Sequence, residues 1–570
     1  MVWKSEHNPA FRSKFSEDVF NQKYAHVGCE TWDALAKVLV YDVCICPERG
    51  KLLPQDEIDS LVEIIRRMYF IPGGRYLYYA GRSRKYFNNC FLLRSEEDTR
   101  EDWANLSWKA ESCLTTGGGI GNNYSIYREE GALLSGTGGY ASGPISKMEM
   151  INEIGRKVMQ GGSRRSAIYA SLIHTHPDVF KFLLAKDWYD LPVLGAYLEN
   201  GKQATVGDLK EKDFNFPAPL DMTNISVNYD TDWLLNYWKS GDVGDVFRKN
   251  IQQACRTGEP GFSFNFFDKE NETLRNACTE VTSEDDSDVC NLGSVNMGRI
   301  PDLDTFRSVV ILSTKFLICG TLRADLPYTK VREVREKNRR LGLGLMGIHE
   351  WLLKKGHKYE VVPEITRWLH VYAQTSDTIS ARFADSLGVS RPVARRAIAP
   401  TGTIGILAGT TTGIEPLFAT SYKRRFLKGT RWHYQYVVDS TADELINLYG
   451  VNPNEIETAL DLAKEPERRI KFQADVQDYV DMAISSTINL PRWDSPDNNA
   501  DTTLRLEFIL ASYSHRLRGF TCYPDGSRGG QPLETVEYRE AKEKLGETFE
   551  ENTKTHDVCD ITGKGGVCGM

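Results

Sequence analysis

The most informative stretch of this sequence is Asn276-Ala277-Cys278-Thr279-Glu280. A second stretch, Cys290-Asn-Leu-Gly-Ser-Val-Asn296, follows it closely. In an extended segment alternate side chains share one face, so Asn276, Cys278 and Glu280 would present an amide, a thiol and a carboxylate together. A thiol can give up a hydrogen, a carboxylate can accept a proton, and an amide hydrogen-bonds hydroxyl groups. The set suits radical or nucleophilic chemistry on a polyol. A structural cysteine with polar neighbours is the plainer alternative, because free cysteine is among the most buried residue types.

Length and composition limit the class of protein. The 570 residues allow one large domain or two to four ordinary ones, and 41% hydrophobic with 26% charged residues is typical of a globular chain. The formal net charge of -8 argues against a broad surface for nucleic acid or for an anionic membrane. A local basic pocket for a small anionic ligand stays open.

The sequence favours a cytoplasmic protein. Its N-terminus lacks the apolar core of a secretory signal, and the longest apolar run, 309–322, is interrupted by Lys315 and too short to span a bilayer. The 12 cysteines are scattered and do not resemble a secreted disulfide framework, so we expect structural thiols beside catalytic or redox thiols.

Periodicity predicts the coarse order of elements. Apolar residues at helical spacing indicate a helical N-terminal region over 1–70, and Asn88 to Leu93 indicates a buried strand. The run from Leu341 to Leu353 is expected to be one close-packed helix. A last strand is expected over 519–523, so that the main domain spans 71–530.

Three glycine-rich stretches, 117–121, 160–165 and 399–416, predict turns or close approach to a ligand. A dinucleotide fingerprint would need glycine at position 122, which is asparagine, and no P-loop motif occurs. Arg164 and Arg165 could meet phosphate, and a threonine-rich turn that opens a helix at 400–403 could cradle one; simple turns remain the alternative. No metal site is expected, because His174 and His176 lack nearby carboxylate or thiol ligands.

The last 40 residues, 531–570, are charged and poor in core-forming residues, which predicts a flexible tail. Cys559 and Cys568 near its end could carry electrons by thiol–disulfide exchange. Unused surface thiols, or a partial metal site with His556, are the alternatives that the residues leave open.

Together, six motifs in order resemble ribonucleotide reductase, from about residue 70 to 530 and again in the tail. They are Asn88-Asn-Cys90, Gln160-Gly-Gly-Ser-Arg-Arg165, Asn276-x-Cys278-x-Glu280, Cys290-Asn-Leu-Gly-Ser-Val-Asn296, Ala399-Pro-Thr-Gly-Thr-Ile404 and the C-terminal cysteine pair. The resemblance implies an α/β fold: a ten-stranded α/β barrel built from two five-stranded halves, with a central finger loop that carries Cys278 at its tip.

The resemblance also implies roles. As a thiyl radical, Cys278 would remove the ribose 3′ hydrogen, Glu280 would accept the 3′-hydroxyl proton, and Asn276 would hydrogen-bond the ribose hydroxyls. Cys90 and Cys290 would supply two reducing equivalents, and the tail pair Cys559 and Cys568 would restore them from an external thioredoxin- or glutaredoxin-like reductant. Implied substrate-binding residues are Asn89, Gly119, Asn224, Ser226, Pro400, Thr401, Gly402 and Thr403. The loop with Gln160, Arg164 and Arg165 resembles the one that senses a nucleoside triphosphate effector.

The source of the radical divides this family. The strand Phe520-Thr-Cys-Tyr523 lacks the adjacent tyrosine pair of enzymes that receive the radical from a ferritin-like subunit, which favours adenosylcobalamin as the cofactor. The catalytic subunit of such a two-protein enzyme is the alternative. Ala277 and Thr279 depart from the common Asn-Pro-Cys-Gly-Glu loop, and the N-terminal region lacks the motif of an ATP cone. A homodimer without nucleic-acid or membrane partners is expected.

Overall fold

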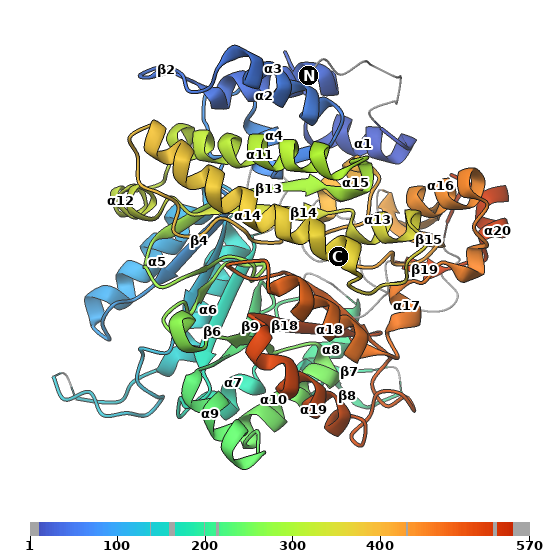
Figure 1. Ribbon diagram of the computed structural model, residues 1–570. Helices are drawn as coiled ribbons and strands as arrows, with labels where there is room; N and C mark the ends of the chain where they lie inside the picture. Colours follow the sequence, from blue (N-terminus) through green and yellow to red (C-terminus); the bar gives the residue numbers. More distant parts are fainter. Residues whose placement is uncertain are drawn as a thin grey trace.

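The computed structural model describes residues 11–136, 138–158, 166–198, 200–212, 216–428, 431–527 and 533–550. At its centre is a barrel of two parallel halves, surrounded by helices (Figure 1). The first half consists of β4 (Cys90–Arg94), β5 (Gly119–Asn123), β6 (Ile168–Ile173), β9 (Thr223–Tyr229) and β10 (Gly261–Phe264). The second half consists of β13 (Asp288–Asn296), β14 (Leu341–Met346), the segment 394–398, β17 (Thr487–Leu490) and β18 (Gly519–Pro524).

Two antiparallel junctions and two bridges close this barrel. The halves meet antiparallel where β4 pairs with β13 and where β10 pairs with β18. The segment 394–398 joins β14 through a parallel Leu343–Arg396 bridge, and it reaches the chain that enters β17 through a parallel Ile398–Ile484 bridge. The predicted ten-stranded barrel of two five-stranded halves is therefore confirmed.

Side chains alternate along the strands of the first half and give its two faces different chemistry. Outward-facing residues are apolar and pack against helices: Ile120, Ile168, Ala170, Leu172, Ile225, Val227, Phe262 and Phe264. Inward-facing residues are polar or glycine, for example Gly119, Gly121, Tyr169, Ser171, Ser226 and Ser263. A strand has a period of two, so one sequence can supply both a hydrophobic outer core and a polar interior.

A finger loop fills the barrel between β10 and β13. Its arms, β11 (Leu274–Arg275) and β12 (Thr282–Ser283), pair antiparallel. A Cβ at Gly121 would lie 1.7 Å from the Arg275 carbonyl oxygen, so β5 lies directly against one arm. On the opposite side the Ala483 N–H donates to the Glu280 carbonyl at 2.9 Å. The finger therefore touches both halves of the barrel, as the resemblance implied.

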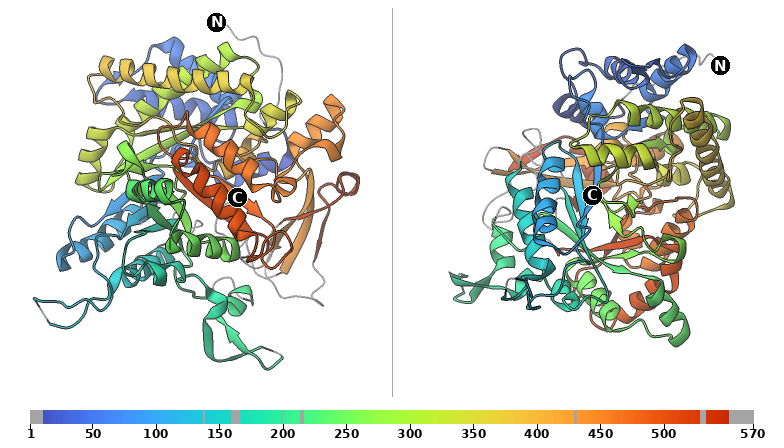
Figure 2. Two further views of the ribbon diagram at one scale, coloured as in Figure 1. Left: turned by 60° about the horizontal axis from the view of Figure 1, so that its bottom comes forward. Right: turned by 90° about the vertical axis from the view of Figure 1, so that its left-hand side faces the viewer.

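Helices enclose the barrel, and the N-terminal ones form a layer at one end of the molecule (Figure 2). This layer contains α1 (Lys14–Lys23), α2 (Trp32–Cys44), α3 (Gln55–Arg66), β3 (Phe70–Pro72) and α4 (Gly74–Tyr79), with the short pair β1 (Ile45–Cys46) and β2 (Gly50–Lys51). The prediction of a helical N-terminal region is confirmed for its described part.

The first half of the barrel is covered by helices that follow its strands. They are α5 (Arg100–Leu114), α6 (Gly143–Lys157), α7 (Val179–Leu183), α9 (Thr231–Ser240) and α10 (Asp245–Thr257), with β7 (Pro192–Tyr197), β8 (Gln203–Thr205) and α8 (Val206–Lys212) beside them. The second half is covered by α11 (Leu303–Arg323), α12 (Thr329–Asn338), α13 (Ile348–Lys354), α14 (Pro363–Ser386), α15 (Gly402–Ala408), α17 (Ala459–Leu462), α18 (Pro466–Gln477) and α19 (Thr503–Tyr513).

The helix α11 is the most apolar long helix of this shell. Within the described residues it alone is long and apolar enough to cross a membrane, yet 67% of its apolar window is buried inside the protein. It packs against α14, α2 and β13. These contacts are those of a core helix.

The expectation of one helix over 341–353 is wrong. Residues 341–346 form β14, and a helix begins only at Ile348. The glycines explain the difference: a Cβ at Gly342 would lie 2.2 Å from the Leu292 side chain, and one at Gly344 would lie 2.7 Å from the Ala397 carbonyl oxygen. Leucines at 341, 343 and 345 face the outer core, so the run has the period of a strand.

The predicted boundary at residue 530 also needs correction. Residues 533–550 carry β19 (Leu533–Thr535), α20 (Tyr538–Glu543) and β20 (Thr548–Glu550). The two strands flank the hairpin of β15 (Ser421–Lys428) and β16 (Arg431–Val438), near α16 (Ser440–Tyr449). Backbone pairing to this hairpin holds a segment that is poor in core-forming residues. The rest of the predicted tail, 551–570, lies outside the described residues.

We predict that Gly121→Ala weakens the protein by about 1–3 kcal/mol, because the new methyl group must displace the Arg275 carbonyl. Urea unfolding of both proteins measures the difference. Gly136→Ala is the matched control, since a Cβ there meets nothing within 4 Å. Equal destabilisation by the two substitutions would contradict the close packing of β5 on the finger.

Candidate active site

Three side chains of the finger and β4 converge in the barrel. The Asn276 Nδ2 group donates to the Cys90 sulfur at 3.0 Å, and the Cys90 thiol approaches Glu280 Oε1 at 4.0 Å. Asn276 and Glu280 are each 1% exposed, whereas Cys278 between them is partly exposed. The finger therefore buries the Asn276 amide and the Glu280 carboxylate and leaves the Cys278 thiol partly accessible at its tip.

A tight turn shapes that tip. The Thr279 N–H donates to the Asn276 carbonyl at 3.0 Å, and Thr279 has φ = 70°, in the left-handed region. A β-branched residue there costs roughly 1–2 kcal/mol, which glycine would avoid. The Asn224 side chain donates to the Ala277 carbonyl at 3.2 Å and holds the turn from β9. The finger therefore forms a tight turn although Ala277 and Thr279 replace the proline and glycine of the common Asn-Pro-Cys-Gly-Glu loop.

Cys90 and Cys290 are direct cross-strand partners in the antiparallel pair of β4 and β13. Opposed residues in such a pair have Cα atoms about 4.5–5.5 Å apart, which is within the range that a disulfide requires. Both cysteines are buried, and neither is in a disulfide within the described residues. Burial raises the pKa of Cys290 well above its usual value. The pair is placed to exchange two thiols for one disulfide without a change in strand register.

Several predicted substrate residues lie around the finger tip. The Gly119 N–H donates to the Asn89 carbonyl at 2.8 Å, and a Cβ at Gly119 would lie 3.3 Å from the Ala277 methyl group. Asn224 is exposed. Ser226 is different: it is 2% exposed and hydrogen-bonded to the buried Tyr169 hydroxyl. The structure therefore places Ser226 in the barrel interior rather than at the exposed tip.

The predicted phosphate loop, Pro400 to Thr403, follows the segment 394–398. That segment contacts the chain around Ala483, which itself binds the finger, because the Ser485 N–H donates to the Ile398 carbonyl at 2.8 Å. Thr401 has φ = 53°, and its hydroxyl accepts from the Gly413 N–H at 2.7 Å. Pro400, Gly402 and Thr403 are partly exposed.

Five predicted residues cannot be placed. Gln160, Arg164, Arg165, Cys559 and Cys568 lie outside the described residues, and their roles stay predictions.

Sequence reasoning did not single out the buried charges around the finger. The Arg275 guanidinium donates to Asn265 Oδ1 at 2.6 Å and to the Glu272 carbonyl at 2.7 Å. Burial and the neighbouring Arg518 lower the pKa of Arg275 to about 9. Burial alone would raise the pKa of Glu272, but Arg518 and the Thr282 hydroxyl outweigh it and lower that pKa to about 2. These groups fasten the base of the finger to β10 and β18.

A second buried pair, Arg340 with Asp288, lies at the start of β14. Arg340 Nε donates to Asp288 Oδ2 at 2.9 Å, and both residues are buried. The signal that could have found Arg340 is a charged residue directly before a run that alternates leucine with glycine.

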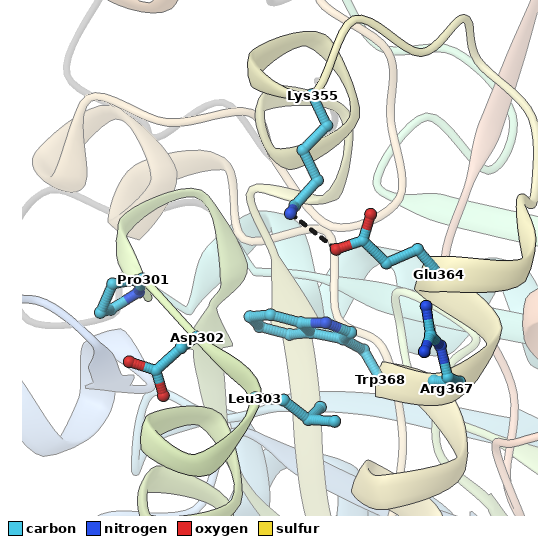
Figure 3. A pocket seen from close by; sticks show the side chains of 7 residues that line it. All are labelled: Pro301, Asp302, Leu303, Lys355, Glu364, Arg367 and Trp368. Carbon is cyan, nitrogen blue, oxygen red and sulfur yellow. Dashed lines mark hydrogen bonds and ion pairs between the residues drawn. The ribbon is translucent and has the colours of Figure 1, made fainter.

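The cavity of about 300 Å³ at the start of α11 is not this site. Figure 3 shows its lining: Pro301, Asp302, Leu303, Lys355, Glu364, Arg367 and Trp368. The Lys355–Glu364 ion pair, at 2.7 Å, crosses it beside the Trp368 ring. None of the predicted site residues lines it. It belongs to the outer helical layer.

No group of three or more histidine, cysteine, aspartate or glutamate residues is suited to hold a metal within the part of the chain that the structure describes. His174 Nε2 lies 3.1 Å from Asp230 Oδ1, and His176 Nε2 lies 2.7 Å from the Tyr127 carbonyl oxygen. Ordinary hydrogen bonds therefore account for both histidines.

Comparison with known proteins agrees with this geometry. The vitamin B12-dependent ribonucleoside-diphosphate reductase of Mycobacterium tuberculosis is 29% identical over 84% of this chain and 73% of its own length. The enzyme of the same name from Thermoplasma acidophilum is 27% identical over 88% of this chain and 69% of its own. A putative adenosylcobalamin-dependent ribonucleoside-triphosphate reductase of Mycobacterium phage D29 is 28% identical over 72% and 60%.

The family match covers the whole barrel. Residues 88–190, 221–372 and 390–523 match the ribonucleotide reductase barrel domain, and these ranges contain the finger, both strands of the Cys90–Cys290 pair and the loop at 400–403. The chain belongs to the ribonucleotide reductase family.

Proposed function

We propose that this protein reduces ribonucleotides to 2′-deoxyribonucleotides through a thiyl radical at Cys278, with adenosylcobalamin as cofactor. The observation that carries the proposal is the convergence of Asn276, Cys90 and Glu280 behind a partly exposed Cys278, with Cys290 opposite Cys90. A radical thiol must be kept from competing donors, and a finger enclosed by a barrel provides that protection.

The residues divide the reaction between them. The Cys278 radical takes the hydrogen from the ribose 3′ carbon, and the Glu280 carboxylate accepts the 3′-hydroxyl proton while Asn276 hydrogen-bonds the ribose hydroxyls. The 2′-hydroxyl leaves as water. Cys90 and Cys290 give two electrons and two protons and become a disulfide, and Cys278 recovers its hydrogen. The 4.0 Å approach of the Cys90 thiol to Glu280 supports proton transfer between these two groups.

The accessible thiol fits direct generation of the radical by a bound cofactor. When bound, adenosylcobalamin supplies the organic radical that takes the hydrogen from a thiol. Cys278 and Thr279 are the partly exposed residues of the finger that would face it. The strand β18 has one tyrosine, Tyr523, followed by Pro524, so it offers no adjacent tyrosine pair to relay a radical from a second protein. The names of the relatives support the cobalamin version over the two-protein alternative.

Partners follow from the same chemistry. Substrate phosphates would bind the 400–403 loop, and a nucleoside triphosphate effector would meet Gln160, Arg164 and Arg165. An external thioredoxin- or glutaredoxin-like dithiol would restore the active-site pair through Cys559 and Cys568. None of the 10 cysteines of the described residues is in a disulfide, which supports a reducing cytoplasm. Exposed Trp108 on α5 and Met150 on the adjoining α6 support a homodimer through these helices.

We predict that the purified protein, without oxygen and with a dithiol and effector nucleotides, forms deoxynucleotide only when adenosylcobalamin is added. Parallel assays with CDP and CTP measure the phosphate preference. Product that instead requires a ferritin-like radical subunit would contradict the cobalamin version while leaving the cysteine roles intact.

Cys278→Ala is expected to lower kcat by more than about a thousandfold, because no other side chain at the tip can hold the radical. The substitution removes a partly exposed sulfur, so substrate binding, measured by equilibrium dialysis, should change little. Cys113→Ala, which removes a buried thiol from α5 in the outer core, is the matched control and should retain turnover. Turnover by Cys278→Ala would overturn the proposed reaction.

A further inference from the structure

We propose that Arg340 stabilises the Cys290 thiolate that leaves when the Cys90–Cys290 disulfide is reduced; this inference rests on the dithiol role proposed above. Strands β13 and β14 are parallel, with Asn291 opposite Leu341. One residue before this pair, Cys290 on β13 and Arg340, which directly precedes β14, are therefore neighbours. The Arg340 side chain turns toward the finger and β13, where it donates to Asp288 at 2.9 Å and to Ser283 on β12 at 3.3 Å.

Arg340 is buried and has an N–H group that lacks a hydrogen-bond acceptor among the described residues. It is 4% exposed, and its Nη1 group is buried without a hydrogen-bond partner among the described residues. A buried donor without a partner is unfavourable, because it has lost its hydrogen bonds to water. A thiolate formed at Cys290 would offer that donor a negatively charged acceptor.

Charged groups from four segments of the chain shift the pKa of Cys290. Burial is the largest influence and raises its pKa; Arg340, before β14, is the next largest and lowers it. Asp288 on β13, Glu280 on the finger and Asp481 before β17 raise it. Asp481 is already bound by backbone N–H groups of the 394–398 segment. Arg340 is thus the cation that opposes burial and three carboxylates at this sulfur.

The reduction step explains why such a cation is useful. A thiolate of the attacking dithiol, which is the tail pair in the proposed cycle and dithiothreitol in the test below, attacks the Cys90 sulfur, which faces Asn276 and Glu280, and the protein S–S bond breaks. Its electron pair leaves on Cys290 as a thiolate, which then takes a proton, while Cys90 forms a mixed disulfide. The second thiol of the reductant displaces Cys90, so the dithiol is oxidised and both protein sulfurs are reduced. A leaving thiolate of lower pKa departs faster.

The test measures disulfide reduction in the full chain rather than turnover. The protein is oxidised, treated with excess dithiothreitol between about pH 6.5 and 9.5, and the alkylated Cys90 and Cys290 peptides are quantified by mass spectrometry over time. Arg340→Gln is expected to slow reduction by about 3- to 30-fold, because one favourable charge is lost. Asp288→Asn is expected to accelerate it, because one unfavourable charge is lost.

Opposite signs separate this role from a structural one, since damage to packing would slow both variants alike. Arg339→Gln is the matched control: Arg339 is equally buried, but it points outward to Ser390 and Thr321, so its loss should leave the rate and its pH dependence unchanged. If Arg340→Gln unfolds, the double variant Arg340→Gln/Asp288→Asn, which leaves neither of these two charges unpaired, should be slower than Asp288→Asn alone.

Two outcomes would contradict different parts of the proposal. Equal rates for the wild type and Arg340→Gln, or for Asp288→Asn and the double variant, would overturn the role of Arg340 alone. A wild-type protein in which Cys90 and Cys290 never form a disulfide would overturn the proposed dithiol function, and the role of Arg340 with it.

Discussion

The close approach of the finger loop to the inner wall of the barrel is the constraint on which the rest of the structure depends. Gly121 leaves no room for a side chain beside the Arg275 carbonyl, and Gly119 leaves little beside Ala277. The neighbouring inward positions carry hydroxyl and amide groups instead of apolar ones. Because the interior is occupied by a hydrogen-bonded loop, the hydrophobic driving force comes from the outer face of the strands, where helices cover aliphatic and aromatic side chains.

Hydrogen bonds and ion pairs among the buried polar side chains connect the finger to the strands that carry the site. Glu272 accepts from Arg518 and from Thr282, which ties the base of the finger to the entrance of β18 and joins its two arms. Arg340 binds Asp288 and Ser283, which ties β14 to β13 and to the finger. Such hydrogen bonds and ion pairs restrict the motion of the segments that they join. Here they hold three cysteines from two strands and one loop in a fixed arrangement, as a reaction in ordered steps requires.

The local motifs of the site could be predicted from the sequence, whereas the charged surroundings could not. Family motifs surround Cys90, Cys278, Glu280 and Cys290, so the sequence predicts them as site residues, and the ten-stranded barrel follows from the same resemblance. The sequence predicts a helix over 341–353 because glycine and leucine suit a close-packed helix. The period of two wins because Gly342 lies against the Leu292 side chain, where a strand without a Cβ fits. The resemblance predicts Ser226 as a substrate-binding residue, and strand alternation alone does not say how deep in the barrel such a residue lies.

Long-range pairing explains the other differences. Residues 533–550 look like a tail because they carry few apolar side chains, yet their strands pair with the β15–β16 hairpin, which lies about a hundred residues earlier in the chain. Arg340 and Asp288 are likewise 52 residues apart and meet only through strand register. The most direct measurement is an anaerobic single turnover without external reductant, with peptide mapping of the cysteines. We expect one Cys90–Cys290 disulfide for each deoxynucleotide formed; product formed while both thiols stay free would contradict this mechanism.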